Sequence, residues 1–390
     1  MSRTRVYLDH NATAPLREEA RAAMLAALDE IGNPSSVHAE GRRARTLVET
    51  AREQVARLVG AAPAEVVFTS GATEANAWAL SGDWDTIIAA GIEHDSILAP
   101  ARAARGTCLE VGAGLEGIAD VPAAAAHVLS GRARGRTLLC LQMANNETGV
   151  VQPVAQAVRF AQPHDVSVHT DAVQAVGRIE IDFSALGVDT MSLSAHKIGG
   201  PKGVGALIVR EGTARAPLIA GSQERRRRGG TENVAGIAAF GAAAAAAAED
   251  LQRMRDVRAL RDQLESEVRA VTPQAVIVGA EAERLANTSV IAMPGLRAET
   301  AVIRLDLAGI AVSAGAACSS GKVGASHVLA AMGTPAPLAR AAIRVSLGTS
   351  TCAADVAAFI TAWRDLNGTS RQAEAANASS QNMSNARASR

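Results

Sequence analysis

A lysine that follows an apolar run is the first residue in this sequence whose surroundings suggest chemistry. The run "TMSLSA" (190–195) predicts a strand, and the chain then passes through His196 into Lys197 and a loop of glycines. Partial burial lowers the pKa of a lysine amine and frees it to form a Schiff base. Lys197 is therefore a candidate Schiff-base amine, and the alternative is a surface lysine in a turn.

Two other strand ends carry groups that fit beside such a lysine. The run "VSVHTD" (166–171) predicts a strand that ends in Asp171, whose carboxylate can hold the proton of a pyridinium nitrogen. The segment "FTSGATEAN" (68–76) predicts a strand that turns at Gly71 into a helix, where free N–H groups and the Thr73 hydroxyl can hold a phosphate. An ordinary glycine turn with a helix cap is the alternative for that segment. Together the three signals indicate a pyridoxal phosphate site.

Predicted helices and strands, which must position these groups, alternate along the first 250 residues. Amphipathic helices are predicted over 15–31, with Leu28 and Ile31 on the apolar face, and over 42–60, with Gly60 as the C-terminal cap. Further strands are predicted at "EVVFTS" (65–70), "TIIAAG" (86–91), "TLLCLQ" (137–142) and "VGALIV" (204–209). This alternation is typical of a mostly parallel sheet flanked by helices, in which ligands bind at the carboxyl ends of the strands.

The sequence after residue 250 predicts a smaller α+β domain. A long amphipathic helix is predicted over 251–271, and strands are predicted at "AVIVG", "TSVIAM", "GIAVSA" and "AIRVSL". The last 24 residues contain no Leu, Ile, Val, Phe, Tyr or Trp, a composition typical of disorder. We expect an N-terminal segment (1–15) that packs with the small domain, a large cofactor-binding domain (16–250), a small domain carrying a cysteine loop (251–366) and a disordered tail (367–390).

Composition excludes several classes of function. The 390 residues are 48% hydrophobic, 20% charged and only 2% aromatic, with a net charge of zero, which argues against a disordered chain and against a nucleic-acid binder. The longest uncharged apolar stretch, 235–248, is shorter than a spanning helix, and Asp9 interrupts the N-terminus before any signal-peptide core. The four cysteines form no C-x-x-C pair. We therefore expect a cytoplasmic protein with neither a membrane nor nucleic acid as a direct partner.

Ordered blocks of sequence cover nearly the whole chain: "VYLDHNATAP", "GNPSSVHAEG", "FTSGATEAN", "IEHDSIL", "MANNETGVVQP", "HTDAVQAVG", "SLSAHKIGGPKGVGAL", "RRGGTENVAGI", "GIAVSAGAACSSG", "SHVLAAMG" and "IRVSLG". In these blocks the chain resembles the cysteine desulfurases of the NifS/IscS type, within the class V aminotransferase-like family. The resemblance implies an α/β, fold-type I enzyme: a large domain with a mostly parallel sheet flanked by helices, and a smaller α+β domain. It also implies a homodimer with pyridoxal 5'-phosphate near the subunit interface.

The resemblance assigns roles residue by residue. Lys197 would carry the cofactor as a Schiff base and move the substrate's α-proton, Asp171 would keep the ring nitrogen protonated, and His94 would stack on the ring. His94 could instead be a helix cap, and Asn33, expected near the substrate, could instead be a turn residue before Pro34. The residues implied to bind the cofactor are Ala72, Thr73, Asn146, Asp171, Gln174, Ser194, Ala195, His196, Lys197 and, from the second subunit, Thr231; those implied to bind substrate are Arg344, Asn33 and Asn146.

Cys318, in "SAGAACSSGKVGASHVL" (313–329), distinguishes the reaction from a plain transamination. The resemblance implies that Cys318 takes sulfur from L-cysteine as a persulfide, leaving L-alanine, and passes it to an iron–sulfur scaffold or another acceptor protein. Transient contact of that persulfide with an iron–sulfur cluster is the one metal role expected. The sulfur pathway stays open between nitrogen fixation, general iron–sulfur assembly and tRNA thiolation. The alternatives are a class V aminotransferase, a selenocysteine lyase and a scaffold that only binds partners.

The sequence also departs from the pattern of that family. The arginine run 225–228 follows Ser222, where a glycine is usual, and Ala325 stands where a proline often precedes the serine. We expect the arginine run to form a solvated face, with binding of an acidic partner or a phosphate as the alternative. None of these departures removes a reacting group.

Overall fold

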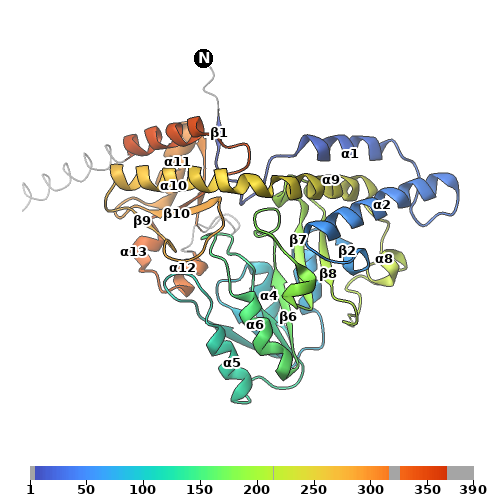
Figure 1. Ribbon diagram of the computed structural model, residues 1–390. Coiled ribbons are helices and arrows are strands. Elements are labelled where there is room, and N and C mark those ends of the chain that lie inside the picture. The colour runs from blue at the N-terminus through green and yellow to red at the C-terminus, as the bar shows by residue number, and fades with distance from the viewer. Residues whose placement is uncertain (1–4, 214, 316–325, 367–390) are drawn as a thin grey trace, which may run out of the picture.

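The protein is described by a computed structural model over residues 5–213, 215–315 and 326–366. Figure 1 shows a large layered body around a central sheet and a smaller body beside it. The helices α9 (Val234–Asp250) and α10 (Met254–Val271) follow one another and run from the first body to the second. The active-site residues come from both bodies, so their contact decides the geometry of the site.

The large body is built on a seven-stranded sheet with the strand order β2-β8-β7-β6-β5-β3-β4. The strands are β2 (Val66–Thr69), β3 (Thr86–Ala90), β4 (Thr107–Val111), β5 (Thr137–Cys140), β6 (Val166–Asp171), β7 (Thr190–Ser194) and β8 (Gly205–Val209). Strands β7, β6, β5, β3 and β4 are parallel, and β8 is antiparallel to both of its neighbours. The mostly parallel sheet predicted from the sequence is thus confirmed. The edge strand β4, whose residues are mostly exposed or half-buried, was missed.

Helices cover both faces of this sheet. Alternate residues of β2 enter two different apolar clusters: Val66 and Phe68 pack in one, and Val67 packs in the other. A sheet buried on both faces needs continuous apolar strands, which explains the short apolar runs of the sequence. The remaining helices of this body are α1 (Glu18–Leu28), α2 (Ala39–Leu58), α3 (Ala72–Leu80), α4 (Asp95–Ala103), α5 (Val121–Leu129), α6 (Val154–Ala161), α7 (Phe183–Leu186) and α8 (Gln223–Arg226).

Helix α1 is shorter than the predicted helix over 15–31. The backbone before it is extended because Arg17 N donates to Gly199 O at 2.9 Å, and this contact delays the start of the helix to Glu18. Its predicted apolar face is buried only in part within this chain: Ala20 is fully buried, whereas Leu28 and Ile31 are 61% and 89% exposed. By contrast, Gly60 directly follows the last residues of α2 with φ +63°, the left-handed cap that the sequence predicted.

The small body contains an antiparallel sheet with the order β12-β13-β10-β9. Its core includes Val345, Phe359 and Trp363, and residues 353–366 form its last helix. The N-terminal strand β1 (Val6–Tyr7) pairs with β11 (Ile310–Ala311), so the chain begins beside this body. The domain boundaries themselves stay a prediction. The other elements are β9 (Val276–Ile277), β10 (Thr288–Ala292), α11 (Ala298–Leu307), β12 (Ser313–Ala314), α12 (His327–Ala331), α13 (Ala336–Ala339) and β13 (Ala342–Ser346).

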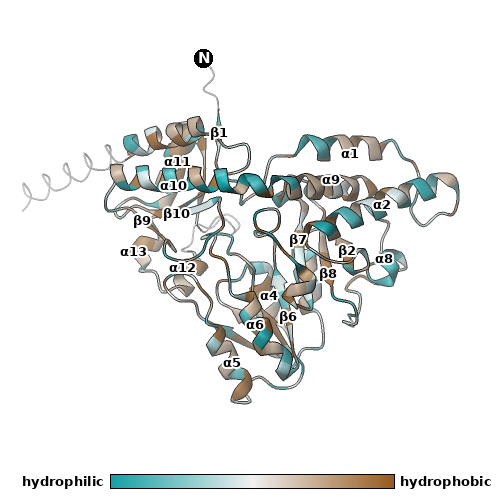
Figure 2. Ribbon diagram, viewed as in Figure 1, coloured by the Kyte–Doolittle hydropathy of each residue, from teal (hydrophilic) through white to brown (hydrophobic). Residues whose placement is uncertain are grey.

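The alanine-rich helix α9 packs within the large body. By length and composition, the continuous stretch Val234–Val271 could cross a membrane, but 61% of its apolar window is buried inside the protein. Figure 2 shows α9 mostly in pale brown, whereas α10 carries teal along much of its length. The buried side of α9 includes Phe240, which meets Phe68 edge-on at 6.3 Å between ring centroids. This burial is that of a core helix.

The arginine run does more than form a solvated face. Glu224, directly before it, is buried and accepts two hydrogen bonds of 2.8 Å from Arg52 and one of 3.0 Å from Phe68 N. Arg228 forms an ion pair with Glu74 at 2.9 Å. Glu224, Arg225 and Arg226 have φ values of 46°, 57° and 65°, a left-handed backbone that side chains rarely adopt. The buried ion pair holds this strained segment against β2.

Candidate active site

A cavity of about 500 Å³ lies where the carboxyl ends of several strands of the large sheet meet the small body. Its walls come from the segments that follow β2, β3, β5, β6 and β7, as a parallel sheet would place them. The opposite wall includes Arg344 on β13. The residues anticipated from the sequence that line this cavity are Ala72, Thr73, His94, Asn146, Asp171, Gln174, Ser194, His196, Lys197 and Arg344.

One end of the cavity has the donors that a phosphate group needs. Helix α3 begins directly after Gly71, so its first N–H groups have no partner within the helix. A Cβ atom at Gly71 or at Gly203 would meet no atom within 4 Å, which leaves space beside the Thr73 side chain. Burial, with Lys197 and Lys202 nearby, lowers the pKa of His196 to about 4, so this histidine is neutral at pH 7. The helix start and the Thr73 hydroxyl together form a cradle for an anion.

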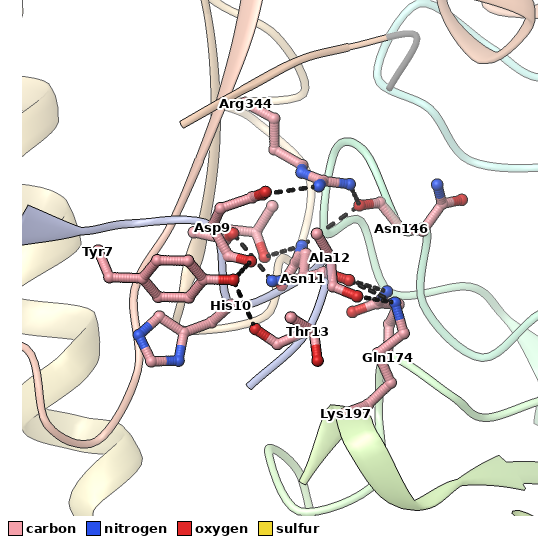
Figure 3. Close-up of polar contacts among 12 residues, drawn as sticks. Tyr7, Asp9, His10, Asn11, Ala12, Thr13, Asn146, Gln174, Lys197 and Arg344 are labelled. Atoms are coloured by element: carbon pink, nitrogen blue, oxygen red, sulfur yellow. Dashed lines mark hydrogen bonds and ion pairs between the residues drawn. The ribbon is translucent and has the colours of Figure 1, made fainter. Parts of the chain in front are cut away.

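Lys197 reaches the cavity from the turn that directly follows β7. Its Nζ donates to Asn11 O at 2.5 Å and to Ala12 O at 3.0 Å. Gln174 Nε2 donates to the same Asn11 carbonyl at 3.1 Å, and Figure 3 shows both side chains converging on this stretch of backbone. The N-terminal segment therefore fixes the lysine and the glutamine relative to each other.

A chain of hydrogen bonds joins Asp171 to His94 through Asn76, which is fully buried behind the cavity, and Ser96, which lines it. Asn76 Nδ2 donates to Asp171 Oδ2 and to Ser96 Oγ, both at 2.8 Å. Ser96 Oγ lies 2.8 Å from His94 Nδ1, and Ser96 N also donates to that nitrogen. His94 is the N-cap of α4, so the capping role foreseen as an alternative is real. His94 therefore caps helix α4 and also lines the cavity.

Arg344 is a buried cation that is held on two sides. Its Nη2 donates to Asp9 Oδ1 at 2.9 Å and its Nη1 to Asn146 O at 3.0 Å (Figure 3). Arg344 Nε and Asn146 Oδ1 are buried without a hydrogen-bond partner among the described residues. Both side chains line the cavity, so these two atoms suit a ligand with a carboxylate and a donor group.

Three of the anticipated residues lie elsewhere, and the position of a fourth is not described. Ala195 is fully buried in the core beneath the cavity, and Thr231 lines an adjoining cavity of about 110 Å³. Asn33 is exposed and is not among the residues that line the cavity; its Oδ1 accepts from Ser35 N at 2.9 Å, which closes a turn around Pro34. Cys318 lies outside the described residues.

Several residues of the site were missed by the sequence reasoning. Asp9 and Asn11 are within the block "LDHNATAP", but their partners Arg344 and Thr288 are more than 270 residues away in the chain. Asn76 lies within helix α3, five residues after Gly71, and nothing in its position along the sequence indicated a contact with Asp171. Their one signal in the sequence was their place within the matched blocks "VYLDHNATAP" and "FTSGATEAN".

The site fits pyridoxal phosphate. A phosphate can bind at the start of α3, the carboxylate of Asp171 can hold a proton on a ring nitrogen, and the Lys197 amine can condense with an aldehyde. The space beside Gly71 and Gly203 supports this fit, because a side chain there would fill the cavity. The described residues contain no cluster of three or more His, Cys, Asp or Glu side chains that could hold a metal ion.

The chain is similar in sequence and in structure to known proteins. The family model described as class-V aminotransferase matches residues 6–359. The chain is 44% identical over 368 residues to a cysteine desulfurase of Cereibacter sphaeroides, covering 90% of this chain and 93% of that protein. It is 40% identical over 364 residues to the cysteine desulfurase IscS of Dictyoglomus turgidum, covering 90% and 91%. The X-ray structure of a NifS-like protein from Rickettsia africae superposes with a TM-score of 0.86 at 33% identity, covering 93% of this chain and 99% of that chain.

Glu93 is a buried acid directly before His94. Its Oε1 accepts from Gln142 N at 2.5 Å, and its Oε2 has no hydrogen-bond partner among the described residues. Burial and, to a smaller extent, the charge of Asp171 raise the pKa of Glu93 to about 8. Glu93 is therefore protonated at pH 7 in the folded protein.

Replacing Glu93 with Gln should make the stability of the protein less sensitive to pH. An unfolded glutamate loses its proton near pH 4.5, whereas folded Glu93 keeps it to about pH 8, so the parent's free energy of unfolding falls as pH rises through that window. Because Gln has no such proton, the stability of E93Q relative to the parent should rise with pH by up to about 1.4 kcal/mol per unit. Urea unfolding at several pH values between 5 and 8 measures this difference. A constant difference across these pH values would show that Glu93 is ionised in the fold.

Proposed function

The chain belongs to the class-V aminotransferase family, and we propose that it is a pyridoxal-phosphate-dependent cysteine desulfurase that forms L-alanine and a persulfide on Cys318. The observation that carries this proposal is the single cavity that joins Lys197 and Asp171 from one sheet to Arg344 from the other. Relatives of 40% and 44% identity over 90% of the chain are named cysteine desulfurases, which supports this reaction over transamination.

Three residues that line the cavity have defined tasks in that reaction. The cofactor, when bound, supplies an electron-accepting ring that stabilises negative charge at the substrate's α-carbon. Asp171 holds a proton at the ring nitrogen, and the bond from Asn76 fixes the direction of its carboxylate. Arg344 binds the substrate carboxylate, and the Lys197 amine takes and returns the α-proton.

The sulfur step needs a thiolate and balances without an external oxidant. The thiolate of Cys318 attacks the sulfur of the bound cysteine, so that a sulfur–sulfur bond forms and the substrate's Cβ–S bond breaks. The electrons of the broken bond stay on the substrate carbon, which gains protons and leaves as L-alanine. Cys318 keeps the sulfur as a persulfide for an acceptor thiol, an iron–sulfur scaffold or another sulfur-accepting protein. We propose the cytoplasm as the place of this transfer.

We also propose that the enzyme is a homodimer. Leu25, Leu28 and Ile31 are 55%, 61% and 89% exposed on and after α1, a group of apolar side chains that the single chain leaves in water. Thr231, which the resemblance assigns to the phosphate of the other subunit, lies outside the main cavity of its own chain. A second copy would explain both observations.

Replacing Lys197 with Ala or Arg should abolish turnover. Neither side chain can form a Schiff base, and loss of the proton-transferring amine alone costs about 10²–10⁴-fold. The visible absorbance of cofactor bound through Lys197 should also disappear. Sulfide and alanine formed from L-cysteine in the presence of a thiol reductant measure the reaction. Formation of the two products at the parent rate in K197R would overturn the role of Lys197.

Replacing Cys318 with Ala should separate the two halves of the reaction. L-cysteine should still change the absorbance of the bound cofactor, because Lys197, Asp171 and Arg344 are all intact. Sulfide release should fall by at least about 10²–10⁴-fold, and no persulfide should form on the protein. The matched control is C352A, since Cys352 is an exposed thiol that should not react with bound substrate. If C318A releases sulfide at the parent rate, direct elimination or a lyase reaction is the better account.

Placing charges on the exposed apolar group should dissociate the dimer. The double variant L28E/I31E would put carboxylates where a second copy excludes water, a large cost for a buried charge. Sedimentation should show a dimer for the parent and a monomer for the variant. Leu129 on α5 is 68% exposed, and L129E is the control that should remain dimeric. A monomeric parent at micromolar concentration would contradict the proposal.

A further inference from the structure

The turn that binds Arg344 also carries a buried acid that the mechanism above does not use. Asn145 Oδ1 accepts from Glu147 N at 2.9 Å and from Thr148 N at 2.8 Å, which fixes the backbone of the turn. The carbonyl of Asn146, between them, accepts from Arg344 Nη1 at 3.0 Å. The orientation of Arg344 and the direction of the Glu147 side chain are therefore set by the same few residues.

Glu147 points away from this turn toward the small body. Its side chain is 3% exposed, and its Oε2 accepts a hydrogen bond from Ser326 Oγ at 2.5 Å. Ser326 Oγ in turn accepts from Leu329 N at 3.0 Å, since Ser326 is the N-cap of α12. Because that bond uses the oxygen as an acceptor, the hydroxyl hydrogen is available for Glu147.

The same carboxyl oxygen also lies next to Gly315. A Cβ atom built at Gly315 would stand 3.2 Å from Glu147 Oε2, closer than side chains normally approach. Gly315 is itself held by its N–H, which donates to Ala342 O at 3.2 Å on the strand that carries Arg344. Gly315 and Ser326 are the described residues on either side of 316–325, the stretch of sequence that contains Cys318.

We propose that Glu147 is a positioning residue for sulfur transfer: its carboxyl group binds Ser326 at one flank of the Cys318-bearing stretch and lies beside Gly315 at the other, next to the turn that binds Arg344. This inference rests on the proposed desulfurase reaction. The reacting sulfur of L-cysteine is placed by the grip of Arg344 on its carboxylate. The same turn thus fixes the substrate and the two points from which the nucleophile's segment departs. Misplacement of a reacting group by about 1 Å can cost about 100-fold in rate.

The role that the geometry gives Glu147 is that of a hydrogen-bond acceptor. Burial raises the pKa of Glu147 to about 7, while the hydrogen bond from Ser326 and the charge of Arg344 favour its ionised form. Either protonation state leaves a lone pair on the oxygen that faces Ser326. A glutamine side chain has the same length and also an acceptor oxygen. Gln should therefore replace Glu147 in this role, whereas Ala should not.

The test compares E147A, E147Q and S326A with the parent holoenzyme, with E180A as a control at an exposed glutamate. Two quantities are measured: the L-cysteine concentration that half-saturates the absorbance change of the bound cofactor, and the single-turnover rate of persulfide formation on Cys318. For E147A and S326A we expect an unchanged half-saturating concentration and a persulfide rate about 10- to 100-fold lower. E147Q and E180A should keep the parent rate.

The outcomes separate this inference from the proposed function. If the parent protein forms no persulfide on Cys318, the proposed function itself is wrong. If the parent forms the persulfide, and both E147A and S326A form it at the parent rate, the proposed role of Glu147 is overturned. An E147Q variant as slow as E147A would overturn it as well, because the ionisable charge would then matter rather than the hydrogen bond. If E147A does not fold, S326A and E147Q decide between these results.

Discussion

The site depends on holding two cations from different sheets beside one cavity. Lys197 follows β7 of the large sheet, and Arg344 lies on β13 of the small one. A turn of five residues, 9–13, lies between them, closed by the bond from Ala12 N to Asp9 O at 3.0 Å. Its carbonyls at Asn11 and Ala12 accept from Lys197, and its Asp9 carboxylate pairs with Arg344. Charged groups inside a protein need such partners, because an unpaired buried charge is strongly destabilising.

That stretch is itself held from both bodies. Asn11 N donates to Ser346 Oγ at 3.0 Å, and its side chain donates to Thr288 Oγ1 at 2.9 Å, both in the small sheet. On the other side, Ala14 N donates to His196 O at 2.9 Å, next to Lys197. The N-terminal residues therefore set the distance between the two sheets at the cavity.

Sequence reasoning located the strand ends well and the contacts between them poorly. Strands buried on both faces are continuous apolar runs, so β5, β6 and β7 could be placed within two residues, and Asp171 and Lys197 could be assigned to one edge. The edge strand β4 lacks such a run. The contact of Asp9 with Arg344 joins two segments that lie far apart in the chain, and the periodicity within one segment carries no record of such a contact.

The protonation of the histidines shows how far the buried network determines the chemistry of the cavity. Burial lowers the pKa of His169 to about 3, so its ring is neutral. His169 Nε2 lies 3.0 Å from Asn76 Oδ1. Because an amide oxygen can only accept a hydrogen bond, the proton of the His169 ring is on Nε2. The NH2 group of Asn76 then faces Asp171 and Ser96, to which it donates.

The same reasoning extends along the chain to the cavity wall. Ser96 Oγ accepts from Asn76, so its own hydrogen faces His94 Nδ1, which also accepts from Ser96 N at 3.1 Å. His94 Nδ1 thus carries no proton, and the neutral ring bears its hydrogen on Nε2. One fully buried histidine on β6, which never touches the cavity, fixes both the carboxylate of Asp171 and the tautomer of His94. Electrostatic preorganisation of this kind needs no movement when substrate binds, because the hydrogen-bond directions are already set by the core.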